Sequence, residues 1–249
     1  MTEFNNRVVL VTGGGAGIGL SAASKFADQG ARVVITGRRE AALRQAAGTV
    51  GIDYIVADAG KPSDAAGTIE ELIRRHERLD VLVNNAGAGA ILPLSEAKFA
   101  QIDEIFSVNV IGPSLLATAA LPHLKQTGGS IVNVSSTFGH KAAESLSHYA
   151  ASKAALEHMT RCWALELAHE GIRVNAVAAG PTESDFLAER MKLSAQQIES
   201  IKASERARIP LGRRGLPGDV ASWIVALASP DAAWTTGQVL TADGGLSIT

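Results

Sequence analysis

Short apolar runs alternate with longer stretches of helical period along the chain. The runs are RVVLVT, ARVVITG, DYIVAD, DVLVNNAG, SIVNVSS and IRVNAVAAG, followed late in the chain by GQVLTADGG. Runs that are apolar almost throughout are typical of parallel strands buried on both faces. The stretches between them, such as residues 17–30, place apolar residues three and four apart and end in glycine, as helices do. The pattern predicts an α/β fold: one domain, residues 1–249, built on a doubly wound parallel sheet with helices on both faces.

One stretch, residues 183–209, departs from this alternation. It is long and lies between two predicted strands, and its apolar residues fall at helical spacing on one side: Phe186, Leu187, Met191, Leu193, Ile198 and Ile201. We therefore expect a helical insert. Because it follows the carboxyl end of a strand, where ligands bind in this architecture, it is either a substrate lid or a purely structural helix pair.

Composition and charge narrow the class of partner. The 249 residues are 46% hydrophobic but only 4% aromatic, which allows a large core of aliphatic side chains. The formal net charge is −2 and no Lys/Arg-rich block occurs, so neither nucleic acid nor an anionic membrane is an expected partner. The expected ligand is a small molecule.

Three features favour a cytoplasmic protein. No apolar run approaches the roughly 20 residues needed to cross a bilayer. The first ten residues, MTEFNNRVVL, do not contain the apolar segment of a signal peptide. The single cysteine, Cys162, falls in a helix of apolar pattern, where we expect it to be a buried filler.

A glycine cluster follows the first predicted strand and leads into a helix. Glycine lets a pyrophosphate approach the backbone N–H groups, and the helix N-terminus adds a partial positive charge. This makes the fold Rossmann-type and predicts cofactor contacts at Gly13, Gly15, Gly17, Ile18 and Gly19. The turn contains no Lys-Ser/Thr pair, which argues against a nucleotide triphosphate loop.

The end of the second strand indicates which dinucleotide binds. An NAD site usually has an acid there to accept hydrogen bonds from the ribose, but this chain has Gly37 followed by Arg38 and Arg39. A guanidinium can bind the additional 2′-phosphate of NADP through paired, charge-assisted hydrogen bonds. The sequence therefore favours NADP(H) over NAD(H). The alternative is that Arg38 and Arg39 are simply solvated residues at the start of a helix.

Tyr149 and Lys153 lie four positions apart in a helical stretch, so their side chains share one face. A free phenol, with a pKa near 10, is a poor base at neutral pH. A cation about 4 Å away contributes on the order of 4 kcal/mol at an effective dielectric near 20, enough to make the phenol more acidic. We therefore expect Tyr149 to exchange a proton with a carbonyl or alcohol oxygen.

Together these motifs resemble those of the short-chain dehydrogenase/reductases. Residues 12–19 are similar to the family's Thr-Gly-x-x-x-Gly-x-Gly turn, NNAG at 84–87 to its fourth-strand motif, and YAASK at 149–153 to its Tyr-x-x-x-Lys pair. Ser136 lies thirteen positions before the tyrosine, as the family pattern requires, and Asn109 corresponds to its tetrad asparagine. TGQVLTADGG near the C-terminus is a further match, so the resemblance covers essentially the whole chain. Within the family, the chain resembles the 3-oxoacyl-carrier-protein reductases.

The resemblance implies a role for each matched residue. Tyr149 would be the general acid/base, Lys153 would lower its pKa and bind the nicotinamide ribose, and Ser136 would hold the substrate oxygen. Asn109 would anchor a water that links Lys153 to solvent. The remaining implied cofactor contacts are Asp58, Ala59, Asn85, Ala86, Gly87 and Thr182. Ala179 replaces the proline that commonly precedes Gly180 in the family, so the contact at Thr182 is the least secure.

The leading hypothesis is an NADP(H)-dependent oxidoreductase that interconverts a ketone, of carbonyl or 3-oxoacyl type, and a secondary alcohol. The alternatives are an NAD-dependent alcohol dehydrogenase and a non-catalytic nucleotide-binding regulator. A methyltransferase is disfavoured because Gly37 stands where it would need an acid. The substrate pocket is expected from residues 88–95, 138–148 and 183–209, whose apolar members hint at a hydrophobic ketone: Ile91, Leu92, Phe138, Leu146, Phe186 and Leu187.

Several neighbouring residues offer competing readings. Ser135 is an alternative to Ser136, but strand alternation places the two on opposite faces. His140 and His148 flank the site and are expected to be solvated, and no histidine has metal-ligand spacing.

The family resemblance also implies a homo-oligomer, with a tetramer favoured, built on long helices near 97–124 and 150–169. Their apolar faces would include Leu115, Leu116, Ala119, Ala120, Met159, Trp163 and Leu167, which can equally be ordinary core.

Overall fold

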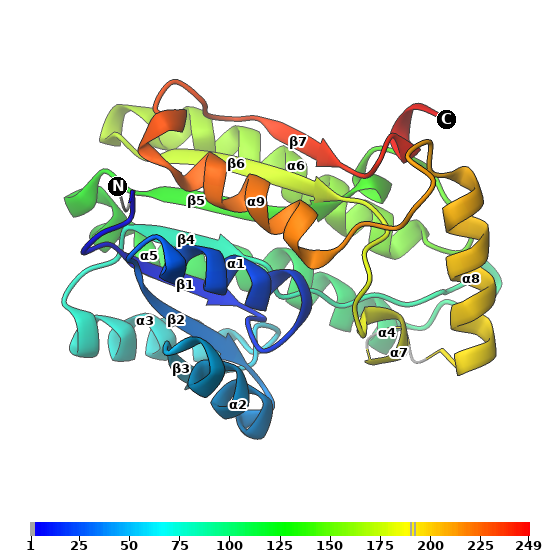
Figure 1. Ribbon diagram of the computed structural model, residues 1–249, viewed down its shortest axis with the longest axis horizontal. Helices are drawn as coiled ribbons and strands as arrows, with labels where there is room; N and C mark the ends of the chain where they lie inside the picture. The colour runs from blue at the N-terminus through cyan, green and yellow to red at the C-terminus, as the bar shows by residue number, and fades with distance from the viewer. Residues whose placement is uncertain (1–2, 190, 192) are drawn as a thin grey trace.

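Seven parallel strands form one sheet through the middle of the molecule, in the order β3-β2-β1-β4-β5-β6-β7 (Figure 1). The structure, a computed structural model, describes residues 3–189, 191 and 193–249. The strands are β1 (Val8–Thr12), β2 (Arg32–Gly37), β3 (Asp53–Val56), β4 (Val81–Asn84), β5 (Ser130–Ser136), β6 (Arg173–Ala179) and β7 (Val239–Ala242). The predicted doubly wound parallel sheet is confirmed.

Helices cover both faces of the sheet, with α1, α2 and α9 on one side and α3, α5 and α6 on the other (Figure 1). Their bounds are α1 (Gly17–Asp28), α2 (Glu40–Val50), α3 (Pro62–His76), α4 (Phe99–Phe106), α5 (Gly112–Thr127), α6 (Ser147–Leu167), α7 (Phe186–Glu189), α8 (Ala195–Arg208) and α9 (Pro217–Ala228). Strand β1 shows why the apolar runs are continuous: Val9 and Val11 pack into one core, and Val8 and Leu10 into the other.

The strand order reverses between β1 and β4, because β2 and β3 lie on one side of β1 and the later strands on the other. In open α/β sheets the crevice at this switch point, at the carboxyl ends of the strands, is the usual ligand site. The glycine turn follows β1 and the NNAG segment begins in β4, so the fold brings two of the sequence motifs to this crevice.

The helix expected near 97–124 spans 99–127 but is interrupted. A π-helical turn, η2 (Ser107–Ile111), separates α4 from α5. Its end passes close to the loop after β3: a Cβ on Gly112 would lie only 2.0 Å from the Ala59 carbonyl oxygen. The expectation that no stretch is long and apolar enough to cross a membrane was wrong for Phe99–Thr127, which passes by length and composition alone. In the fold α5 packs against α3, and α4 against α6.

The insert at 183–209 forms two separate helices. The one-turn helix α7 lies beside the crevice, and α8, which begins with a capping box at Ser194, stands at the edge of the molecule (Figure 1). The predicted apolar side is only partly buried at Ile198 and Ile201, and the buried residue of α8 is Glu205. Two of the predicted insert positions, 190 and 192, lie outside the described residues.

The expectation for Cys162 was wrong, because this side chain is exposed on α6. The buried face of α6 carries polar groups, among them Ser152, Glu157 and Thr160, alternating with Leu156 and Ala164. Cys162 lies between Thr160 and Ala164 in sequence and therefore points away from their shared face. The apolar pattern was misleading because this helix buries polar residues over the site.

Candidate active site

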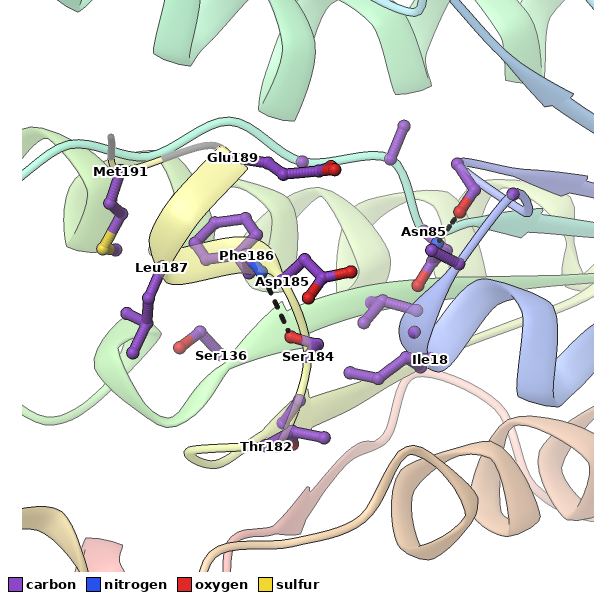
Figure 2. Close-up of a pocket in the computed structure, with 18 of the residues that line it drawn as sticks. Ile18, Asn85, Ser136, Thr182, Ser184, Asp185, Phe186, Leu187, Glu189 and Met191 are labelled. Carbon is purple, nitrogen blue, oxygen red and sulfur yellow. Dashed lines mark hydrogen bonds between the residues drawn. The ribbon is translucent and has the colours of Figure 1, made fainter. Parts of the chain in front are cut away.

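A cavity of about 490 Å³ runs along the carboxyl ends of the strands. Its walls come from the glycine turn, the β2–α2 turn, the loop after β4, the end of β5, α6, the loop after β6 and α7. Figure 2 shows Phe186, Leu187 and Met191 on the side near Ser136, and Ile18 and Asn85 on the other side. The cavity therefore joins the predicted cofactor motifs to the predicted catalytic residues.

The glycine turn is shaped to admit an anion. Gly13 and Gly17 have φ of +65° and +56°, which favours glycine at both positions. Ala16 precedes α1 without any side-chain cap, so the first N–H groups of α1 are not capped by a side chain. A helix N-terminus with free N–H groups suits a pyrophosphate, and the residues present therefore fit a dinucleotide.

The loop after β4 braces this turn. The Thr12 hydroxyl accepts hydrogen bonds from the backbone N–H groups of Asn85 and Ala86, each at 3.0 Å. The Asn85 side chain donates to the carbonyl oxygens of Thr12 and Gly13 at 2.8 and 3.2 Å. The two motifs thus hold each other in place at the switch point.

Most of the predicted cofactor residues line the cavity: Gly13, Gly15, Gly17, Ile18, Arg38, Arg39, Asn85, Ala86, Gly87, Tyr149, Lys153 and Thr182. Gly19 does not; a Cβ there would lie 2.4 Å from Asn85 Nδ2, so this glycine permits close packing. Asp58 and Ala59 line a smaller adjoining hollow of about 30 Å³, which also includes Thr36 and Ala86.

The two arginines after β2 both meet carboxylates. Arg39 forms a bidentate pair with Glu189 of α7, in which Nη2 donates to Oε2 at 2.8 Å. Arg38 lies 3.9 Å from Asp58. Arg39 thereby links the β2–α2 turn to α7 across the cavity, a contact that the sequence did not indicate.

Tyr149, Lys153 and Ser136 meet at one wall of the cavity. Tyr149 and Lys153 project from the same face of α6, and Ser136 is the last residue of β5. All three are at least nine-tenths buried. The Lys153 ammonium donates to the Val134 carbonyl oxygen at 2.9 Å and lies 6.0 Å from the centroid of the Tyr149 ring. The helical spacing therefore places both groups as predicted.

The two serines of β5 have different environments. Ser136 lies close enough to Tyr149 to lower the pKa of its hydroxyl, and its own hydroxyl accepts a hydrogen bond from the backbone N–H of Phe138 at 3.3 Å. Ser135 instead donates to Glu157 Oε1 at 2.8 Å. Both serines line the cavity, but the Ser135 hydroxyl is already engaged by a carboxylate of α6.

Asn109 lies in the η2 turn and is fully buried. Its Oδ1 accepts from the backbone N–H of Ala88 at 2.9 Å, and its Nδ2 donates to the Ala88 carbonyl oxygen at 2.8 Å and to Ser152 Oγ at 2.9 Å. The amide is thus committed to fixing the loop after β4 against α6. Asn109 does not line the cavity, and its side chain is already hydrogen-bonded. Any water that it anchors would therefore have to bind its backbone.

Burial shifts the ionisation of both groups on α6. Burial raises the pKa of Tyr149, and the neighbouring Ser136 side chain offsets part of that rise. Burial also lowers the pKa of Lys153 to about 8, against the Coulombic effect of Glu157, which raises it. The expected lowering of the tyrosine pKa by Lys153 is not seen in this state: burial of the phenol is the main cause of the shift, and Lys153 is not among its causes.

The buried ammonium costs stability, which gives a testable prediction. Lys153 ionises at about 8 in the folded chain, against an ordinary value of 10.5. Below pH 8 the cost of burying the charge is fully present. This cost falls as pH rises from 8 toward 10.5, because in that range the unfolded chain binds more protons than the folded chain does. Lys153→Met should therefore raise the free energy of unfolding near pH 7 by about 3 kcal/mol. Urea unfolding measures this.

The pH dependence supplies the control for that prediction. The gain of Lys153→Met over wild type should shrink as pH rises from 8 toward 10.5, since both chains then carry a neutral side chain. A variant that is less stable than wild type at both ends of that range would contradict the assigned cause.

The loop after β6 is held by a buried arginine that the sequence did not single out. Arg214 donates to the Thr182 carbonyl oxygen at 2.6 Å and pairs with Glu183 at 3.1 Å and with Glu205 of α8. Arg214 and Glu205 also line the cavity. The Thr182 hydroxyl donates to the Gly180 carbonyl oxygen at 2.9 Å, so the loop is ordered despite the replacement of proline by Ala179.

Apolar side chains line the part of the cavity where the substrate is expected. Phe138, Phe186, Leu187 and Met191 line it, and the rings of Phe186 and Tyr149 lie 6.2 Å apart. The other three residues expected there, Ile91, Leu92 and Leu146, do not line it, and Leu92 is buried. His140 and His148 also lie outside it.

No group of three His, Cys, Asp or Glu side chains that could hold a metal ion occurs among residues 3–189, 191 and 193–249.

A Rossmann-type sheet, a glycine turn and a tyrosine–lysine pair at one cavity define a dinucleotide-dependent oxidoreductase. Comparison with known proteins identifies the family. Residues 13–247 match the family model described as Enoyl-(Acyl carrier protein) reductase. The chain belongs to the short-chain dehydrogenase/reductase family. As a member it is an enzyme that interconverts carbonyl and alcohol groups with a nicotinamide cofactor.

Relatives extend over the whole chain. A 3-oxoacyl-(acyl-carrier-protein) reductase of Thermotoga maritima is 37% identical, covering 99% of this chain and 100% of the relative. The L-fucose dehydrogenase of Bos taurus is 34% identical, covering 99% and 92%. A crystal structure of a short-chain dehydrogenase/reductase of unknown function from Caenorhabditis elegans, with cofactor, has a TM-score of 0.91 at 32% identity, covering 99% and 97%.

Proposed function

We propose that the protein is an NADP(H)-dependent reductase of a hydrophobic ketone, of carbonyl or 3-oxoacyl type, that also oxidises the matching secondary alcohol. The observation that carries the proposal is the meeting of Tyr149, Ser136 and Lys153 at a cavity whose far end is the uncapped N-terminus of α1. A non-catalytic regulator would not need a phenol and an ammonium buried together at a ligand cavity.

The residues divide the chemistry between them. A bound nicotinamide would supply hydride for reduction and accept it for oxidation. Ser136 would hold the substrate oxygen beside the Tyr149 hydroxyl, which donates its proton to that oxygen as reduction proceeds. The buried ammonium of Lys153 would stabilise the phenolate left behind. Asn109 would fix the loop after β4, on which the cofactor side of the cavity depends.

The ionisation of the site suits reduction near neutral pH. Burial raises the pKa of Tyr149, so the phenol is protonated and ready to donate. Lys153 loses its charge as pH rises through about 8. The rate of ketone reduction should therefore fall on the alkaline side of that value.

The preference for NADP(H) rests on Arg38 and Arg39 at the adenosine end of the cavity, where Gly37 replaces an acid. A specific observation favours the second candidate, an NAD-dependent dehydrogenase: both guanidinium groups lie near carboxylates, and that of Arg39 is held bidentately by Glu189. A 2′-phosphate would have to displace this carboxylate.

Glu189→Gln is accordingly expected to tighten binding of 2′,5′-ADP by about threefold to tenfold, because the exposed ion pair that competes for Arg39 is worth roughly 1 kcal/mol. Isothermal titration calorimetry with 2′,5′-ADP measures the change. 5′-AMP, which has no 2′-phosphate, serves as the control ligand and should bind wild type and variant equally. Equal affinity of both proteins for 2′,5′-ADP would refute the competition.

The substrate class is supported by the apolar wall of Phe138, Phe186, Leu187 and Met191. The two named relatives act on chemically different molecules, an acyl chain and a sugar, so family membership alone does not determine the substrate class. We propose that the insert at 183–209 is the substrate lid, since α7 supplies part of this wall.

A panel of ketones and secondary alcohols, assayed by cofactor absorbance with NADPH and NADH in parallel, tests the function. The proposal expects reduction of an apolar ketone with NADPH preferred. A tenfold or greater preference for NADH would select the dehydrogenase instead. Binding of NADPH without turnover of any compound would favour the regulator.

We also propose a homotetramer in the cytoplasm. Leu116, Ala120 and Leu167, which the sequence offered for an interface, are core residues, but Phe99, Leu115 and Leu165 are exposed. These lie on α4, α5 and α6, the helices expected to assemble. Apolar side chains this exposed are commonly covered by a partner.

Leu165→Asp should dissociate the assembly, since Leu165 is 84% exposed in the single chain and a charge in an apolar interface is costly. Light scattering after size exclusion reads the mass. Leu216→Asp, at an exposed leucine at the start of α9, is the control. A wild-type monomer would overturn the proposal, and so would a variant that keeps the wild-type mass.

A further inference from the structure

Glu157 is a buried carboxylate that the proposed chemistry does not use. It lies on α6 one helical turn beyond Lys153, on the same face, and only 4% of its surface is exposed. A carboxylate withdrawn from water to this extent must be held by hydrogen bonds or by charge.

Three elements converge on this carboxylate. Ser135 of β5 donates to Oε1 at 2.8 Å, and the Nδ1 of His140 lies 3.2 and 3.4 Å from the two carboxylate oxygens. The turn between them passes so close that a Cβ on Gly139 would lie 2.4 Å from Oε1. Glu157 therefore ties the turn after β5, next to Ser136, against α6.

The same network reaches Lys153. Ser135 Oγ also lies 3.3 Å from the Lys153 carbonyl oxygen, so one hydroxyl contacts both α6 residues. The Lys153 ammonium donates to the neutral Val134 carbonyl oxygen, whereas the Glu157 carboxylate is contacted by Ser135 and His140. A buried cation with a neutral partner depends on nearby negative charge to remain protonated.

The ionisable groups around this network come from several elements. They are Tyr149 on α6, His140 after β5, Asp243 after β7, and Asp185, Glu189, Glu205 and Arg214 on the cavity wall. Burial lowers the pKa of Lys153 to about 8, and Glu157 is the charge that raises it.

We propose that Glu157 is a positioning residue of the active site, whose buried carboxylate keeps the Lys153 ammonium charged and fixes the turn that follows Ser136. The inference rests on the proposed function, because it assumes that Lys153 takes part in catalysis. The effect of Glu157 on the charge of Lys153 can, however, be measured without turnover.

Two substitutions separate charge from hydrogen bonding. Glu157→Gln keeps an oxygen that can accept from Ser135 but removes the charge. Ser135→Ala removes the hydrogen bond and keeps the charge. Glu157→Met, also uncharged and of similar length, repeats the test if the glutamine variant does not fold by circular dichroism.

Competitive acetylation with acetic anhydride across a pH series, read by peptide mass spectrometry, gives the pKa of Lys153 in each protein. We expect a value of about 8 in wild type and a fall of about one unit in Glu157→Gln, the usual size for loss of one neighbouring charge. Ser135→Ala should stay close to wild type. An unchanged Lys153 pKa in both uncharged variants overturns the inference.

Kinetics provide the second readout. When Lys153 is less charged, the Tyr149 phenolate is harder to form. The acid limb of the pH–rate profile for alcohol oxidation should therefore move to higher pH in Glu157→Gln. A lower rate with an unmoved limb would mean that Glu157 is merely structural. If wild type turns over no substrate, the proposed function fails, and the acetylation result still decides the electrostatic claim.

Discussion

Tyr149→Phe is expected to lower kcat for ketone reduction by about 10³-fold, with NADPH binding unchanged. A positioned general acid contributes about 10² to 10⁴-fold, and the upper half of that range applies because the phenol is buried and water cannot readily replace it. The substitution removes only the hydroxyl and keeps the ring, whose packing near Phe186 helps to enclose the cavity. Steady-state kinetics with NADPH measure the loss.

A second variant tests the neighbour of Tyr149 at the end of β5. Ser136→Ala should also impair kcat, because Ser136 lies beside Tyr149 and lines the cavity. A Tyr149→Phe enzyme that keeps more than about a tenth of wild-type kcat would rule out this residue as the proton donor.

Arg38→Asp is expected to change the ratio of NADPH to NADH affinity by about 100-fold in favour of NADH. A hydrogen bond to a charged group contributes roughly 1.5–3 kcal/mol, and the new carboxylate would in addition repel the 2′-phosphate. It would also supply the acid that ribose recognition in NAD sites uses. Fluorescence titration with both cofactors measures the two dissociation constants.

Arg44→Asp makes the same change of charge on α2 away from the cavity, where Arg44 pairs with Glu40. Arg44→Asp should leave the ratio of NADPH affinity to NADH affinity near that of wild type. If both variants shifted the ratio alike, general surface charge would explain the effect. If neither did, Arg38 would have no part in cofactor choice.

The sequence predicted the architecture because each strand carries its own signal. Strand β5 is buried at every position, and three of its four polar side chains, those of Asn133, Ser135 and Ser136, form hydrogen bonds. The glycine turn was equally readable, since the positive φ of Gly13 and Gly17 limits the residues that fit. Helical spacing alone placed Tyr149 and Lys153 on one face.

Contacts between distant segments were not predictable in this way. Arg39 and Glu189 are 150 positions apart, and nothing in either local pattern marks them as partners. The Arg214 cluster joins the loop after β6 to α8 and depends on how the insert folds back. Glu157 had a local signal, its spacing of four from Lys153, but its burial follows from the close approach of the turn at Gly139.

The error at Cys162 has the same origin. Polar residues on α6 are normally assigned to the solvent side, yet Ser152, Glu157 and Thr160 face inward because partners on β5 and in the η2 turn satisfy them. Asn109, for instance, donates to Ser152. A helix that passes over an active site can bury its polar side, and only the tertiary structure reveals this.

The most direct test of the account compares NADPH consumed with secondary alcohol formed from one apolar ketone, in wild type and in Tyr149→Phe. The account predicts equal amounts of both in wild type and no alcohol above background in the variant over the same time. Alcohol formed at a similar rate by both proteins would contradict it.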